Sequence, residues 1–290
     1  MTQCPMTDTL LPAFRKPPVV ETVLGVQFDP IPGFGNAHLG AFWKWLIANS
    51  TRSFDERWTT ISDAPPIEPA FERFGESQVW SPDELRIRVG RPSLRLQIRN
   101  SVADAMIQVQ DTRLHYNWIG KRGEDYKRYP KVRPKFDRVY ELFREFLQSE
   151  KLDIPKENQW EVTYVNHIPR ASGWNTPEDW PGLFIGLPGP WGAMPLGEVR
   201  PESVAGAWHF EIPPQRGRLH VDLKHVRTAV PEAKELMRLT LTARGAIGKS
   251  AEGETALSEG LDLGRRTIVR AFAGLTSTEA HRIWERTDDH

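Results

Sequence analysis

Cationic and aromatic side chains alternate along residues 117–133, and this pattern could bind an anionic partner. Lysine and arginine can neutralise phosphate groups, while aromatic rings stack on nucleic-acid bases. The same pattern also suits a connection in which Trp118 and Tyr129 anchor a strand to a helix and the cations are only solvated. The sequence contains no pattern of a known nucleic-acid-binding fold. Both interpretations therefore stay open.

Arginines upstream extend this basic segment. In residues 84–90 and 93–100, arginine and glutamine alternate with apolar residues, which predicts two strands with one apolar face and one basic face. Residues 85–140 carry 14 Lys and Arg against 5 Asp and Glu, although the whole chain has a formal net charge of zero. Acidic side chains on neighbouring strands could also balance these cations. The candidate binding residues are Arg86, Arg88, Arg95, Arg99, Asn117, Trp118, Lys121, Arg122, Tyr129 and Lys131.

Two histidines and two carboxylates could hold a metal ion in a hairpin over 203–226. A turn at 213–217 would place them on the polar face of two paired strands, and imidazole and carboxylate groups are ligands of zinc and related ions. The same layout is equally typical of a solvent-exposed face with an ion pair between Glu211 and Arg218. No helical metal-binding motif supports the metal site. No metal is favoured, and the weak candidate ligands are His209, Glu211, His220 and Asp222.

Arg265 falls on the apolar stripe of a helix predicted over 261–275. A buried guanidinium needs an anionic partner, because an unpaired buried charge is costly. The partner could be a carboxylate such as Glu21, in a strand predicted over 19–28, or the anionic group of a ligand. We predict a structural pair between Glu21 and Arg265.

Other motifs of enzyme chemistry are missing from the sequence. No Gly-rich phosphate loop opens a helix, and no Gly-x-Ser-x-Gly motif is present. The single cysteine, Cys4, stands near the N-terminus, which excludes a disulfide scaffold and a thiolate metal cluster. We therefore expect no cofactor and favour a protein that is not an enzyme.

Hydrophobic periodicity predicts the elements that must position these residues. Helices are expected over 38–49, 134–148 and 261–275, and strands over 19–28, 84–90, 93–100, 105–118, 160–168, 203–212, 217–226 and 235–246. The order predicts an α+β fold with a large, curved, mostly antiparallel sheet packed by three main helices. It could consist of two pseudo-repeated β-α-β-β-β-α halves. We expect a flexible terminus at 1–16 and two α+β subdomains, 17–169 and 170–290, packed as one unit.

The expected location follows from what the sequence lacks. No apolar run approaches the roughly 20 residues of a membrane-spanning helix. The first residues have neither the basic region nor the long apolar region of a secretion signal. We expect a protein of the bacterial cytoplasm without a membrane partner.

Several short motifs carry a family resemblance. They are Pro18-Val19-Val20-Glu21-Thr22-Val23-Leu24, Ile107-Gln108-Val109-Gln110 leading to Asn117-Trp118, Tyr129-Pro130, Tyr164-Val165-Asn166, and the terminal Phe272, Leu275-Thr276-Ser277 and Trp284. Through these motifs, the sequence resembles a sporadically distributed family of uncharacterised bacterial proteins. The resemblance implies a fold and hardly any chemistry, since the function of the family is not established. A sporadic distribution is compatible with a horizontally acquired system, such as phage defence or a toxin partner.

Together these observations predict a non-enzymatic binding or accessory protein. Its basic, aromatic-interleaved surface would contact another protein or an anionic ligand. Two alternatives stay open. One is a nucleic-acid-binding component of a defence or toxin–antitoxin-like system, and the other is a metal-dependent hydrolase.

Overall fold

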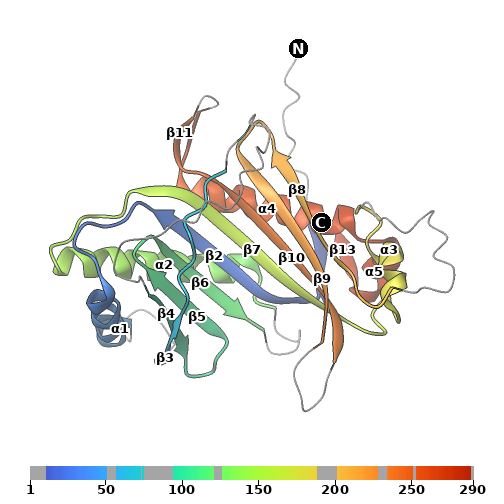
Figure 1. Cartoon of the computed structure of the whole chain (residues 1–290), viewed down its shortest axis with the longest axis horizontal. Coiled ribbons are helices and arrows are strands. Elements are labelled where there is room, and N and C mark those ends of the chain that lie inside the picture. The colour runs from blue at the N-terminus through green and yellow to red at the C-terminus, as the bar shows by residue number, and fades with distance from the viewer. Residues whose placement is uncertain are drawn as a thin grey trace.

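The protein has a large, open antiparallel sheet with helices packed against it (Figure 1), which confirms the predicted α+β fold. The structure is a computed structural model, and it describes residues 11–50, 57–72, 74, 94–120, 126–187, 201–227, 234–250 and 253–288. Apolar alternation along each long strand accounts for the sheet, since it gives one face that must be covered.

Nine strands form the main sheet, in the order β3-β4-β5-β6-β2-β7-β10-β9-β8. Its strands are β2 (Val19–Phe28), β3 (Trp58–Ala64), β4 (Arg95–Asn100), β5 (Ala105–Gln110), β6 (Arg113–Ile119), β7 (Glu157–Pro169), β8 (Ala205–Ile212), β9 (Gly217–Arg227) and β10 (Glu235–Ala246). Two small sheets pair β1 (Pro12–Phe14) with β13 (Arg286–Asp288) and β11 (Gly248–Ser250) with β12 (Gly253–Thr255).

The sheet has two halves of similar topology around the central pair β2 and β7, and β3 is an additional strand of the first half. β2 pairs with β6, the last strand of its own meander, and β7 pairs with β10 in the same way. β7 therefore begins the second half of the sheet. The two halves share one continuous hydrogen-bonded sheet.

Helices α2 (Tyr129–Ser149) and α4 (Leu257–Leu275) lie on one face of the sheet, which we call the covered face (Figure 1). Helix α1 (Asn36–Ser50) packs against α2 and β4. The shorter helices are η1 (Pro177–Asp179), α3 (Trp180–Leu183) and α5 (Thr278–Ile283). Among the helices that the structure describes, none is long and apolar enough to cross a membrane.

Three predicted elements differ from the structure, and the predicted strand over 84–90 lies outside the described residues. Residues 105–118 form a hairpin, because Asp111 and Thr112 make a turn without the Gly or Pro that would signal it. Helix α2 begins five residues early, with Pro130 in its first turn. Residues 11–16 are not a loose terminus, since β1 pairs with β13.

Glycines in α4 determine how closely this helix approaches the sheet. A Cβ at Gly260 would lie 2.2 Å from Cδ1 of Trp160, and one at Gly264 would lie 2.8 Å from Cζ3 of the same ring. Trp160 is completely buried on β7. The helix therefore rests directly on this indole, and this contact fixes the position of the adjacent Arg265.

Candidate functional site

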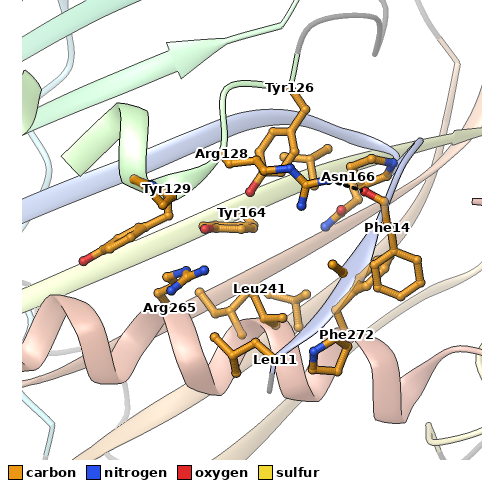
Figure 2. Close-up of a pocket in the computed structure, with 17 residues that line it drawn as sticks. Leu11, Phe14, Tyr126, Arg128, Tyr129, Tyr164, Asn166, Leu241, Arg265 and Phe272 are labelled. Atoms are coloured by element: carbon orange, nitrogen blue, oxygen red, sulfur yellow. Dashed lines mark hydrogen bonds between the residues drawn. The ribbon is translucent and has the colours of Figure 1, made fainter. Parts of the chain in front are cut away.

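A cavity of about 180 Å³ lies on the covered face, between β1, β7, the start of α2 and the middle of α4 (Figure 2). Most of its lining is apolar or aromatic. The lining residues are Leu11, Pro12, Ala13, Phe14, Pro17, Val19, Tyr126, Arg128, Tyr129, Pro130, Tyr164, Asn166, Leu241, Arg265, Ile268, Val269 and Phe272. Arg128 and Pro130 are exposed, so the cavity reaches solvent beside the start of α2.

Each wall of the cavity has a simple origin in the sequence. Alternation along β7 turns Tyr164 and Asn166 to the covered face, together with the apolar Val162 and Ile168. Pairing with β13 holds β1 in place, and the ring of Phe14 lies edge-on to Phe272 of α4 at 5.3 Å. The cavity is thus built by segments from both ends and the middle of the chain.

Arg265 is the inner cation of this cavity. Its guanidinium carbon lies 5.1 Å from the centre of the Tyr129 ring, within cation–π range. Asp262, one turn earlier, instead accepts a hydrogen bond from the Tyr129 hydroxyl at 2.7 Å and lies 3.4 Å from Nη1 of Arg133. No carboxylate within the described ranges forms an ion pair with Arg265.

Asn166 brings an unpaired acceptor to the same cavity. The side chain is 1 % exposed, and its Nδ2 donates to the carbonyl oxygen of Leu239 at 3.1 Å. Its Oδ1 is buried and accepts no hydrogen bond from any described residue. The buried hydroxyl of Tyr164 interacts with the side chain of Tyr126. Buried polar atoms are normally satisfied, so the unpaired Oδ1 of Asn166 beside the cavity indicates a place for a ligand.

The electrostatics of the cavity favour a negative ligand. Burial raises the pKa of Tyr164 well above its ordinary value, the neighbouring Tyr126 adds to the rise, and the charge of Arg265 opposes it. Burial also raises the pKa of Tyr126. Both hydroxyls therefore stay protonated at neutral pH. None of the described lining residues is Asp, Glu, His or Cys, and the second cation, Arg128, donates to the carbonyl oxygen of Phe14 at 3.0 Å.

The predicted basic surface does not assemble as expected among the residues that the structure describes. Arg86, Arg88, Lys121 and Arg122 lie outside them. Arg95 and Arg99 are half-buried on β4, and Lys131 is exposed on α2. Trp118 is a core residue whose ring lies edge-on to Tyr126 at 5.4 Å, and Tyr129 forms the cavity wall. Asn117 is buried on the opposite face from Trp118, because adjacent strand residues alternate.

We call the sheet face opposite α2 and α4 the open face, and it holds a charge cluster around Glu161. Nη1 of Arg113 lies 3.2 Å from Glu161, and Nε2 of His115 lies 3.6 Å from it. Burial lowers the pKa of His115 to about 4; Glu161 opposes this shift, and Arg113 and Arg95 add to it. His115 is therefore neutral at neutral pH.

Residues 65–72, which we call the crossing segment, run over the open face (Figure 1). The amide of Ile67 donates to Gln110, and the amide of Ala70 donates to Gln27, both at 2.9 Å. At the end of the segment, the side chain of Glu72 is 3 % exposed. It binds three side chains: Arg244 at 2.7 Å, His220 at 2.8 Å and Arg218 at 3.1 Å.

Glu72 therefore neutralises the cations of β9 and β10 from within the molecule. Burial would raise the pKa of Glu72, but hydrogen bonds and charge from His220 and Arg244 outweigh burial and lower the pKa to about 2. The carboxylate stays ionised at neutral pH, where these partners need it.

The predicted pair between Glu21 and Arg265 is wrong. Glu21 faces the open side of β2 and accepts a hydrogen bond from Nδ2 of Asn117 at 2.6 Å. Arg265 lies on α4, on the covered side. The sheet separates the two groups, because the alternation that turns Leu24 and Val26 toward the helices turns Glu21 away from them.

The four weak metal-ligand candidates do not form a metal site. His209 and His220 are opposite each other on β8 and β9, with ring centres 4.7 Å apart. Glu211 accepts from the amide of Gln215, and Asp222 lies 3.4 Å from Lys224. In the described part of the chain, no group of three or more His, Cys, Asp or Glu residues could hold a metal ion.

Sequence reasoning missed Tyr164 and Asn166 as site residues, whereas Tyr126 lies in the basic segment that it singled out. One signal was available, since Asn166 is a polar residue in the apolar set of its strand. The residues behind the family resemblance gave a second signal: Tyr129, Pro130, Tyr164, Asn166 and Phe272 all line the cavity. No family model and no curated protein matches the sequence. The geometry of the cavity is therefore the basis for assigning a function.

Proposed function

We propose that this protein binds a small ligand with one anionic group, and that Arg265 holds this group in the cavity on the covered face. The observation that carries the proposal is the guanidinium of Arg265, which stacks on Tyr129 and has no carboxylate partner among the described residues. A cation beside apolar walls is stabilised by an anion, and hydrogen bonds to charged groups are among the strongest.

The size and chemistry of the cavity support binding rather than catalysis. A cavity of about 150 Å³ can hold benzene, so a volume of about 180 Å³ suits a molecule of one ring. The described lining offers no nucleophilic Cys, no carboxylate and no His that could act as an acid or base near neutral pH. The chain has one cysteine and so no internal disulfide, which is compatible with a role in the cytoplasm.

A calorimetric titration tests this proposal. Benzoate and hexanoate are the anionic probes, and benzamide and hexanamide are their neutral counterparts. We expect at least one acid to bind, its amide not to bind, and Arg265→Met to weaken binding about 10- to 100-fold. Arg266→Met is the matched control, because Arg266 follows in the same helix and does not line the cavity. Equal binding to both variants, or no binding of either acid, would refute the proposal.

A second candidate, contact with nucleic acid through the open face, is favoured by one observation. Arg95, a half-buried cation of β4, has an Nε atom without a hydrogen-bond partner among the described residues. Burial, followed by the charge of Arg113, lowers the pKa of Arg95, so a nearby anion would stabilise the charged form of Arg95. A gel shift with single-stranded DNA at 50 and 200 mM salt checks this candidate. If several phosphates are contacted, the affinity should be about a thousandfold lower at the higher salt concentration. Salt-independent or absent binding rejects it.

A further inference from the structure

The cavity has two polar ends, and the ligand must match both. Figure 2 shows Arg265 beside Tyr129 and Tyr164 at one end, with Asn166 on the other side of Tyr164. Tyr164 and Asn166 are two residues apart on the same face of β7, which separates their Cα atoms by about 6.6 Å. The cation and the unpaired amide oxygen thus lie on different sides of Tyr164 in the same cavity.

The Asn166 end needs a hydrogen-bond donor. Its Nδ2 already donates to the carbonyl oxygen of Leu239, and this bond fixes the orientation of the amide. Oδ1 is left as a buried acceptor, and no described residue donates to it. Asn166 is 1 % exposed, so its acceptor is held in place by the packed core and does not belong to a mobile surface side chain.

The walls between these ends favour a flat ring. Phe14 and Phe272 meet edge to face at 5.3 Å, and the rings of Tyr126 and Tyr164 meet in the same way at 6.4 Å. Leu241, directly opposite Tyr164 on β10, also lines the cavity. Aromatic side chains prefer edge-to-face or offset contacts with other rings, which such walls can offer.

We propose that the ligand is a monocyclic aromatic carboxylic acid with a hydroxyl or amino group on the side of the ring away from the carboxylate. The carboxylate pairs with Arg265, the ring lies between Phe14, Tyr164 and Leu241, and the distal O–H or N–H donates to Oδ1 of Asn166. This inference rests on the proposed function, because it requires the anion at Arg265.

Three probes separate this inference from the general one: 4-hydroxybenzoate, 4-fluorobenzoate and 4-hydroxybenzamide. All three fill the ring site, but 4-fluorobenzoate lacks the donor and 4-hydroxybenzamide lacks the charge. Calorimetry should show 4-hydroxybenzoate binding about tenfold more tightly than 4-fluorobenzoate, since one buried acceptor would otherwise stay unsatisfied. Asn166→Leu should remove this preference, while Arg265→Met should weaken both acids.

The outcomes are distinct for the two proposals. Equal affinity for the two acids in the wild-type protein, with both depending on Arg265, overturns the donor inference and leaves the general proposal standing. Binding of hexanoate, with no binding of either benzoate, likewise overturns the donor inference alone. If the acids bind Arg265→Met as tightly as the wild-type protein, both proposals are overturned. If Asn166→Leu does not fold, the ratio of the two affinities in the wild-type protein still decides.

Discussion

The two faces of the sheet differ in whether their partly or fully buried cations have a carboxylate partner. On the open face, Arg113 has Glu161, and Arg218 and Arg244 have Glu72 from the crossing segment. On the covered face, Arg265 has an aromatic ring and a cavity but no described carboxylate. A basic sheet face with its own counterions is a structural network, whereas a cation beside an open cavity is the better candidate for binding.

The same substitution on both faces gives the strongest test of this contrast. Arg113→Met leaves Glu161 buried with weaker partners and should lower the free energy of unfolding by about 3–5 kcal/mol. Arg265→Met leaves no described carboxylate unpaired and should change it by less than about 0.5 kcal/mol. Urea unfolding at neutral pH measures both values. A loss at Arg265 as large as that at Arg113 would mean that Arg265 has a structural partner.

Acid should destabilise the protein through the open face. The pKa of His115 is 6.5 in the ordinary case and about 4 in the folded protein, so between these values only the unfolded chain takes up the proton. The free energy of unfolding is therefore highest above pH 6.5 with respect to His115. It falls by about 3 kcal/mol as the pH is lowered to 4. Glu72, with its pKa lowered to about 2, continues the loss from pH 4.5 downward.

Urea unfolding at pH 7.5, 5.5 and 4.5 checks this pH dependence. The wild-type protein should lose stability across the series, and His115→Gln should lose less because the titrating group is gone. An identical slope in the two proteins would show that His115 does not remain neutral in the folded state.

A smaller effect should come from the packing that positions Arg265. Gly260→Ala brings a Cβ to 2.2 Å from the Trp160 ring, and such overpacking should cost about 2 kcal/mol. Gly274→Ala, in the same helix, meets nothing within 4 Å and should stabilise the protein by up to about 1 kcal/mol. Chemical unfolding compares the two variants. Equal effects would show that α4 does not depend on close contact with Trp160.

Apolar alternation predicted most of the sheet, because it follows directly from having one covered face, but it missed β3 and the turn between β5 and β6. Helical periodicity also placed Arg265 on the apolar stripe of its helix. It could not show which cations were already neutralised, because Glu72 comes from a Pro-rich segment without periodicity, 148 residues before His220. The pair with Glu21 was wrong for a reason visible in the sequence, since alternation turns Glu21 away from the helices.

Crystals soaked with 4-bromobenzoate test the central contrast most directly, since bromine is located by its anomalous signal. The account predicts one bromine site in the cavity of Figure 2, with the carboxylate within hydrogen-bond distance of Arg265, and no bromine there in Arg265→Met crystals. Bromine found only beside Arg95 and Arg113 on the open face, or retained in the cavity after Arg265→Met, would contradict it.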